Sequence, residues 1–384
     1  MGSHFEVRKA RPFELVPNFL EKRGRRVKKF VFIFVVGFLF VSCAAGPSVN
    51  KVSERVTVQT EFSEKREVKE EVLSEQLNAL NQSISFLLEE VASLRYRLDS
   101  LQTRPSITTY KLPPEVFLCG ERFPLEDRNV WENLDREFLL ALSNEVQVLL
   151  WMKRTRRYFP WIEKKLKEMG LPDDLKYVTI TESSLRPEAV STSGAAGIWQ
   201  FIPSTGEKYG MRKNRSLDER FDFFKATEGA LSYLRSLYEE FGSWILSMAA
   251  YNAGENRVRR EIELQKTRNY FYLDLPLETE RYIYKIAVAK MILSDPRRYG
   301  YRLEEKEFYS PLQVERIQIE LVQPLPIMEV ARATGFFYKE IKELNPHFFE
   351  EAIPLGNHFL NLPLGTAEKF WTFFSLWKRE REDK

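Results

Sequence analysis

The chain has 384 residues, of which 43% are hydrophobic, so it can bury at least one full core, and this length predicts two or three structural units. The composition excludes a wholly disordered protein. A net charge of +3, from 58 basic and 55 acidic side chains, gives no electrostatic indication of nucleic-acid binding. His4, His347 and His358 lie neither at ligand spacing nor beside a carboxylate cluster, so we expect no metal and no other cofactor.

A basic run at residues 22–29 is followed by an apolar stretch at residues 30–41 and then by Cys43. This order is typical of a signal peptide. The apolar stretch has about a dozen residues, whereas a helix that spans a bilayer needs about 20. The sequence LFVSC resembles a bacterial lipoprotein processing box, with Phe40 where Leu is usual. We therefore expect residues 1–43 to be a signal and anchor region with Cys43 lipidated; an uncleaved membrane anchor with an incidental cysteine is the alternative.

Either interpretation has the rest of the chain exported, so we expect a periplasmic lipoprotein that its lipid anchors to a membrane. Ala44 stands where an Asp retains lipoproteins in the inner membrane of some bacteria, which favours the outer membrane. The other cysteine, Cys119, lies in a very different setting, so a structural disulfide with Cys43 is the weaker interpretation.

The next pattern is a heptad repeat, in which apolar residues alternate spacings of four and three. The residues of this seam are Leu73, Leu77, Leu80, Ile84, Leu87, Val91, Leu94, Leu98 and Leu101. Their assignment to a and d positions favours a parallel homo-dimer, with a trimer as the alternative. We expect residues 73–104 to form a coiled coil that self-associates through residues 73–101; an amphipathic helix packed on its own domain is the other interpretation.

The composition changes on either side of the heptads. Residues 44–72 are polar and rich in Glu, Lys, Ser and Val, so we expect a tether that becomes helical toward its end. Pro105, Pro113 and Pro114 then end the helix, and residues 105–123 are predicted to be a linker.

From residue 129 to about residue 299 the apolar residues recur at helical spacing, and no stretch alternates as a strand would. The informative segment is 175–210, where Glu182 closes an apolar helical run. Its carboxyl group should be partly desolvated and hold a proton near neutral pH. A turn of small residues, SGAAG, follows, and then Gln200, Phe201 and a helix with Ser204 as its predicted cap. The nearby carboxylates, which we expect to be solvated, are Asp173, Asp174 and Glu188.

Taken alone, this segment also fits a tight helix–loop–helix with one satisfied glutamate. Two further segments weigh against that interpretation: MAAYNAGENRV at residues 248–258 and LPLETERYIYK at residues 275–285. Together with SGAAGIWQFIPSTG and the GLP at residues 170–172, they resemble the family-1 lytic transglycosylases, and among them the branch of membrane-bound lytic murein transglycosylase D. The resemblance covers residues 124–301 and implies a helical fold like that of goose-type lysozyme.

The resemblance implies that Glu182 is the catalytic acid/base. It also implies substrate-binding roles for Ser183, Ser191, Gln200, Tyr251, Asn252 and Tyr282. One departure concerns the family's ETR triplet, because Arg281 is displaced by one position here. Trp199, Phe201 and Tyr251 are either stacking platforms for sugar rings or part of the core.

The implied activity is cleavage of peptidoglycan glycan strands between N-acetylmuramic acid and N-acetylglucosamine. An ordinary glycosidase needs two carboxylates. A lytic transglycosylase needs one, because the substrate's N-acetyl carbonyl stabilises the anomeric centre and its C6 hydroxyl attacks it, which leaves a 1,6-anhydromuramic end. Two alternatives are a hydrolytic muramidase of the same fold, and a non-catalytic scaffold whose stalk spaces a peptidoglycan-binding head from the membrane.

The pattern changes again beyond residue 311. Ile317, Ile319 and Leu321 alternate like a strand, residues 327–334 and 338–344 predict two short helices, and a return strand follows around Leu360 and Leu362. This β-α-α-β order, with IKELNP and LNLP, resembles a degenerate LysM unit at residues 309–369. The usual GDT turn is replaced by residues 323–326, so a purely structural appendage on the catalytic domain is an equal alternative.

We expect residues 370–384 to form a last helix that frays into solvent. The predicted fold class is therefore mainly α: a lysozyme-like helical catalytic domain at residues 124–308, an N-terminal coiled-coil stalk and a small C-terminal α+β LysM-like module.

Overall fold

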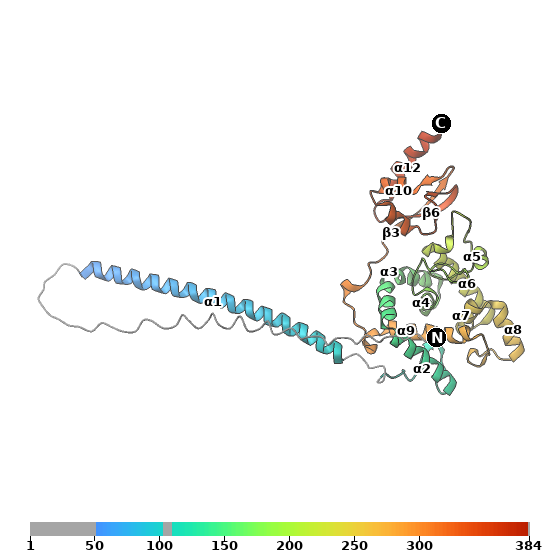
Figure 1. Cartoon of the computed structure of the whole chain (residues 1–384), viewed down its shortest axis with the longest axis horizontal. Coiled ribbons are helices and arrows are strands. Elements are labelled where there is room, and N and C mark those ends of the chain that lie inside the picture. The colour runs from blue at the N-terminus through green and yellow to red at the C-terminus, as the bar shows by residue number, and fades with distance from the viewer. Residues whose placement is uncertain (1–50, 103–109, 383–384) are drawn as a thin grey trace, which may run out of the picture. The chain divides into compact units, whose positions relative to one another are not determined.

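A computed structural model describes residues 51–102 and 110–382 (Figure 1). Most of the described chain is helical, and its strands form three two-stranded sheets, so the predicted mainly α fold class is confirmed. The chain divides into two compact units, Met1–Leu87 and Leu88–Lys384. The predicted signal region and the lipidation site at Cys43 lie outside the described residues.

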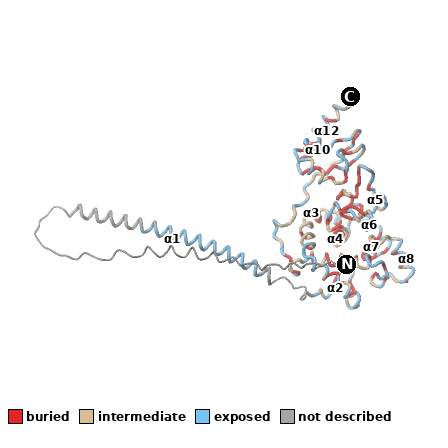
Figure 2. Tube along the Cα trace, viewed as in Figure 1, coloured by how far each residue is buried: buried red, intermediate tan, exposed pale blue. Residues whose placement is uncertain are grey.

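Helix α1 (Lys51–Gln102) is one uninterrupted helix of 52 residues. It begins well inside the segment 44–72, which the sequence analysis expected to be helical only toward its end. Residues 48–104 contain neither Gly nor Pro, so nothing local stops the helix from extending. Figure 2 shows exposed residues along α1, and the heptad side chains from Leu73 to Leu98 are each between 44% and 60% exposed within the single chain. No helix in the described ranges is both long and apolar enough to cross a membrane.

Eight helices build the domain that follows, and they pack around one apolar core (Figure 2). Their bounds are α2 (Arg128–Ser143), α3 (Glu145–Met169), α4 (Val178–Ser183), α5 (Pro203–Lys208), α6 (Phe223–Phe241), α7 (Trp244–Ala253), α8 (Glu255–Gln265) and α9 (Leu277–Ser294). Short 3₁₀ helices are η1 (Asp173–Tyr177), η2 (Glu219–Phe221), η3 (Tyr270–Tyr272), η4 (Pro296–Tyr299) and η5 (Glu305–Glu307). Helix α9 lies centrally, because it packs against both α2 and α7 and also against α4.

The predicted linker at residues 105–123 ends earlier than expected. Strands β1 (Phe117–Leu118) and β2 (Glu121–Arg122) form a hairpin, and Leu118 and Phe123 are fully buried in the helical core. The Glu121 carboxylate accepts hydrogen bonds from the Ser243 hydroxyl at 2.6 Å and from the first backbone N–H of α7. The end of this segment is therefore part of the helical domain, since it adds core side chains and caps a helix.

Helix α5 begins one residue before the predicted cap. Pro203 is its first residue and Ile202 occupies the cap position without a side-chain hydrogen bond, so Ser204 lies inside the helix. A proline at the first helical position has the backbone angle the helix needs and no N–H to satisfy, which explains why no capping hydroxyl is required.

The C-terminal module has the predicted β-α-α-β order. Strands β3 (Val314–Leu321) and β6 (Gly356–Pro363) pair antiparallel, with Ile319 opposite His358. The helices between them, α10 (Ile327–Thr334) and α11 (Tyr338–Leu344), have the predicted bounds, and β4 (Leu325–Pro326) pairs with β5 (Ala352–Ile353).

The expected last helix is present, but its residues up to Trp377 do not fray into solvent. Helix α12 (Ala367–Glu382) places Phe370, Phe374 and Trp377 in the core of the C-terminal module, where each is at most 4% exposed. A module of this size has little apolar surface of its own, so these three aromatic side chains supply a large share of its core.

Candidate active site

A cavity of about 440 Å³ lies beside α4. Its walls come from the end of α4, the loop at residues 184–202, α7 and α9. Six of the seven side chains that the sequence analysis selected line it: Glu182, Ser191, Gln200, Tyr251, Asn252 and Tyr282.

Glu182 lies at the last turn of α4, where the helix ends abruptly. Ser184 and Leu185 both have left-handed backbone angles, with φ of 56° and 59°, and Leu185 inserts its side chain into the core. Their N–H groups bond to the Ile180 and Thr179 carbonyls, which satisfies the end of the helix. This turn keeps the Glu182 carboxyl group at the boundary between the core and the cavity.

The Glu182 carboxyl group is set to hold a proton near neutral pH. Burial raises its pKa from 4.5 to about 7, and the nearby charge of Glu278 acts in the same direction. Two groups oppose this shift: Tyr282, whose hydroxyl donates a hydrogen bond to Oε1, and Lys285. Burial also raises the pKa of the Tyr282 hydroxyl well above 10, so this phenol stays neutral and remains a donor.

Two more carboxylates line the cavity, Glu255 and Glu278, and the sequence analysis did not weigh them. Burial acts to raise the pKa of Glu255, but hydrogen bonds from its own backbone and from Tyr233, at 2.8 Å, hold it below the usual value. Glu278 lies four residues before Tyr282 on α9, and Lys285 three residues after it. That spacing puts all three side chains on one face of α9, which is the signal by which the sequence would have revealed them.

The loop at residues 184–202 is held by its own polar groups. The Ser191 hydroxyl accepts the Ala195 N–H at 2.9 Å and contacts the Ser193 hydroxyl at 2.9 Å. Gln200 has a left-handed backbone (φ 51°), and its amide donates to the carbonyls of Ala189 at 3.1 Å and Gly197 at 2.7 Å. These bonds fix the loop's shape and leave its Ser191 and Gln200 side chains on the cavity wall.

Helix α7 contributes the opposite wall. The Tyr251 hydroxyl donates to the Trp199 carbonyl at 2.8 Å, which joins α7 to the loop. The Asn252 carbonyl oxygen accepts from the Thr279 hydroxyl at 2.8 Å, which joins α7 to α9 and leaves the amide group of Asn252 as a donor on the cavity wall.

The structure does not place Ser183 in the cavity. Its side chain is 3% exposed, and its hydroxyl donates to the Ile198 carbonyl at 2.7 Å. This contact ties the end of α4 to the loop, so Ser183 supports the wall of the cavity from behind. Of the three aromatic candidates, Trp199 and Phe201 belong to the core, at 0% and 2% exposed, although Phe201 borders the cavity. Tyr251 is only partly buried and lines the cavity.

The expectation of solvated carboxylates holds for Glu188, which is exposed, and fails for Asp174. Asp174 accepts the Cys119 N–H and the Lys290 ammonium, each at 2.7 Å, and its side chain is only 18% exposed. It connects the β1–β2 hairpin to α9, a structural role that depends on residues distant in sequence.

Comparison with known proteins shows what the helical domain resembles. Residues 159–273, less than a third of the chain, match the family model of the transglycosylase SLT domain. We call the helical domain that contains this match the SLT domain. The matched segment of the SLT domain includes α4, the 184–202 loop and α7, and Tyr282 follows it along the chain. The predicted resemblance to the family-1 lytic transglycosylases is thereby confirmed.

The chain is also similar to several known proteins. Over 197 residues the chain is 36% identical to membrane-bound lytic murein transglycosylase D of Escherichia coli (strain K12), covering 50% of this chain and 43% of that protein. Over 133 residues it is 31% identical to membrane-bound lytic murein transglycosylase C of Actinobacillus succinogenes, covering 31% of this chain and 36% of that protein. Among solved structures, the 70 kDa soluble lytic transglycosylase SLT70 of Escherichia coli is 22% identical, with a TM-score of 0.31. The match covers 46% of this chain and 32% of the SLT70 chain. The chain spans less than half the length of these two curated relatives.

Proposed function

We propose that this protein is a peptidoglycan lytic transglycosylase that cleaves the β-1,4 bond between N-acetylmuramic acid and N-acetylglucosamine. Three things support the proposal: the SLT domain, the two relatives named lytic murein transglycosylases, and the cavity beside α4. The single observation that carries it is Glu182, a carboxyl group on the wall of that cavity whose pKa burial raises to about 7.

In the proposed mechanism Glu182 acts first as an acid and then as a base. Because Oε1 accepts the Tyr282 hydroxyl, the acidic proton resides on Oε2. Glu182 donates this proton to the glycosidic oxygen, and the bond from that oxygen to C1 of the muramic acid breaks. The substrate's own N-acetyl carbonyl stabilises the anomeric carbon. The C6 hydroxyl of the same sugar then attacks C1 and returns its proton to Glu182, leaving a 1,6-anhydromuramic end.

The other cavity residues are proposed to bind the glycan strand. Ser191, Gln200 and Asn252 present a hydroxyl and two amides to sugar hydroxyls and N-acetyl groups, and Tyr251 presents aromatic surface to the sugar rings. Ser183 takes part only by holding the loop in place.

Digestion of purified sacculi by the protein tests this function, with the soluble products read by mass spectrometry. We expect muropeptides with anhydro ends, each one water lighter than a hydrolysis product. Glu278 in the same cavity is a second carboxylate that a hydrolytic muramidase would need. Products with reducing ends would establish that alternative, and tight binding to sacculi without soluble product would establish the non-catalytic scaffold.

We further propose that the protein works in the periplasm and is anchored to a membrane, preferentially the outer membrane, by a lipid on Cys43. The relatives' names include the words membrane-bound, and the processing box before Cys43 supports a lipid as the anchor. Replacement of Cys43 by Ala is expected to release the protein from the membrane fraction. Continued membrane retention of Cys43→Ala would exclude lipidation as the anchor.

Helix α1 is proposed to self-associate as a coiled coil, a parallel dimer with a trimer as the alternative. A seam of exposed leucines is costly in water, and a second copy of the same heptads covers it. The double variant Leu80→Lys and Leu87→Lys is expected to be monomeric by light scattering, whereas Phe86→Lys, which lies outside the seam, should retain the wild-type mass. A monomeric wild type would refute the proposal.

A further inference from the structure

A large part of the contact between the C-terminal module and the SLT domain is made by residues 212–222 of the SLT domain. Two backbone hydrogen bonds join them as in a short antiparallel pair, from the Asp218 N–H to the His347 carbonyl and from the Phe349 N–H to the Ser216 carbonyl, each 2.9 Å. Between these bonds Leu217 is 1% exposed and belongs to the core of the module instead of the core of the SLT domain. The segment therefore belongs structurally to both parts.

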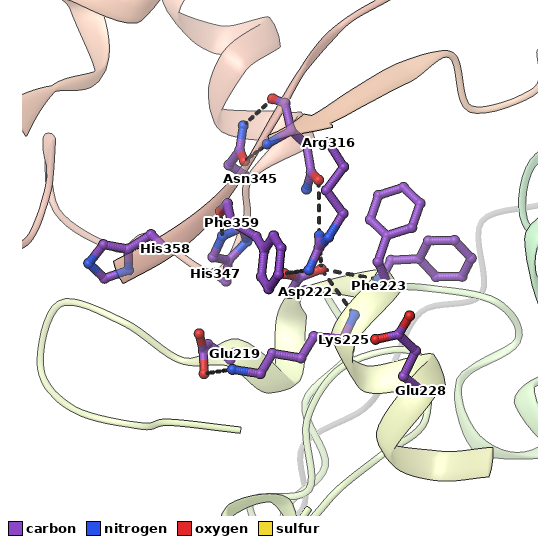
Figure 3. A network of polar contacts seen from close by, with 12 residues as sticks. Glu219, Asp222, Phe223, Lys225, Glu228, Arg316, Asn345, His347, His358 and Phe359 are labelled. Atoms are coloured by element: carbon purple, nitrogen blue, oxygen red, sulfur yellow. Dashed lines mark hydrogen bonds and ion pairs between the residues drawn. The ribbon is translucent and has the colours of Figure 1, made fainter. Parts of the chain in front are cut away.

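A buried ion pair fastens the same junction (Figure 3). The Arg316 guanidinium, from β3, donates to both carboxylate oxygens of Asp222 at 2.9 Å, and it also donates to the Asn361 side chain of β6 at 3.0 Å. Asp222 in turn caps α6 by accepting the Phe224 and Lys225 N–H groups. The side chain of Asp222 is 2% exposed and that of Arg316 is 18% exposed, so this two-pronged contact is largely shielded from water.

A second set of bonds ties the segment to the module from its other end. The Glu219 carboxylate accepts the Arg212 backbone and guanidinium N–H groups and the Lys225 ammonium. Burial acts to raise the pKa of Glu219, but these three donors lower it to about 2. The Arg212 guanidinium also donates to the Asn357 carbonyl at 2.8 Å, in the module.

On its opposite side the segment holds the wall of the active-site cavity. Arg220, 4% exposed, pairs with Asp218 through two hydrogen bonds of 2.9 and 2.7 Å. Its Nη1 group donates to the Gly194 carbonyl at 2.8 Å and to the Phe201 carbonyl at 2.7 Å. Those two carbonyls lie on either side of Gly197, where a Cβ atom would lie only 1.9 Å from the Arg220 carbonyl oxygen. The loop that lines the cavity is therefore packed directly against the segment.

We propose that the C-terminal module is a brace for the active site: through residues 212–222 it holds the loop at residues 191–201 in the conformation that binds the glycan. Asp218 is the link, because its backbone N–H is bound by the module and its carboxylate orients Arg220, which fixes the loop carbonyls. Arg220 and Arg316 are positioning residues in this arrangement. The activity measurement in the test below rests on the proposed function, whereas the measurement of loop motion does not.

The test uses the full-length chain and short soluble glycan strands, so that bulk attachment to sacculi does not contribute. In the double variant Asp222→Asn and Arg316→Met both charges of the pair disappear together, and Asn still caps α6, so no unpaired charge is left buried. Arg316→Lys keeps the charge without the two-pronged geometry. Arg332→Met is the matched control, since Arg332 is exposed on α10 and pairs with Glu329 of its own helix at 3.0 Å.

We expect amide hydrogen exchange at residues 191–201 to accelerate in the double variant, with circular dichroism unchanged. A displaced loop should lower kcat/KM by about ten-fold to 100-fold, Arg316→Lys should fall between the double variant and the wild type, and Arg332→Met should match the wild type. Wild-type loop exchange and wild-type kcat/KM in the double variant would overturn the brace. If the wild type shows no turnover at all, the proposed function is wrong. Amide hydrogen exchange at residues 191–201 then still tests whether the module holds the loop.

Discussion

Two glutamates that the fold shields from water have opposite electrostatic settings. Glu182, on the cavity wall, has the Tyr282 hydroxyl, the like charge of Glu278 and the opposite charge of Lys285 near it, but no cation of the described residues bonds to it directly, and burial raises its pKa to about 7. Glu219, at the junction between the SLT domain and the C-terminal module, is buried as well, yet Arg212 and Lys225 lower its pKa to about 2. Burial alone therefore does not mark a carboxyl group as a proton donor. The partners decide whether the buried group keeps a proton for chemistry or keeps a charge for structure.

The largest effect is expected from Glu182→Gln. The amide preserves the shape of the side chain and removes its transferable proton, so turnover should fall by about 100-fold to 10,000-fold. Release of anhydro-muropeptides measures this, with circular dichroism as the check on folding. Undiminished release would exclude Glu182 as the acid.

Glu219→Gln should lower the stability of the fold, because Glu219 takes no part in the proton transfer itself. The change removes charge-assisted hydrogen bonds to Arg212 and Lys225, both of which regain some water, so the free energy of unfolding should fall by about 2 to 3 kcal/mol. Denaturant titration at pH 7 measures the loss.

The same comparison has a defined pH dependence. Because the pKa of Glu219 is lowered from 4.5 to about 2 by folding, its contribution is fully present above pH 4.5 and disappears as the pH falls toward 2. The difference in stability between wild type and Glu219→Gln should shrink across that window. A difference that is constant from pH 6 to pH 3 would contradict the ion-pair origin.

The wild-type enzyme should lose activity as the pH rises through about 7. Glu182 must be protonated to act as an acid, and its pKa is about 7 in the folded protein, so the protonated fraction declines above that value. The pH profile of kcat/KM on soluble glycan strands measures this limb. A profile flat from pH 6 to pH 9 would show that a different group supplies the proton.

The smallest expected effects are shifts of the alkaline limb of the pH profile when Glu278 or Tyr282, the neighbours of Glu182, is replaced. Glu278 raises the pKa of Glu182, so Glu278→Gln should move the alkaline limb to lower pH; Tyr282 lowers it by hydrogen bonding, so Tyr282→Phe should move the limb to higher pH. Opposite displacements confirm that both side chains act on the same carboxyl group. Displacements in one direction would contradict the arrangement on α9.

A local pattern drew attention to Glu182, because an apolar helical run and a turn of small residues lie within one segment. The catalytic role of Glu182 was predicted from the family resemblance, since the local pattern also fits a structural glutamate. Tyr282 lies 100 residues further along the chain and was selected by family resemblance, although Arg281 beside it is displaced from the family pattern. Glu278 and Lys285 were missed although their spacing places them on the same face of α9 as Tyr282. That this face of α9 turns toward the cavity beside α4 depends on tertiary packing, which the spacing alone does not show.

The errors at the ends of domains have a common cause. The β1–β2 hairpin is too short to predict a core by itself, and the aromatic residues of α12 do not show by their own spacing which core they join. Each contributes a few buried side chains, such as Phe123 and Phe370, to a core formed by residues elsewhere in the chain. The contact between Asp222 and Arg316 could not be predicted for the same reason, since the two residues are 94 positions apart in the sequence.

The close approach at Gly197 has a consequence for inherited variation. A single added methyl group there would collide with a backbone carbonyl that has no freedom to rotate aside, and the residue's φ of 81° is itself unfavourable for any other amino acid. A base change that replaces this glycine is therefore expected to distort the cavity wall and lower activity, in a protein whose reactive groups are all intact.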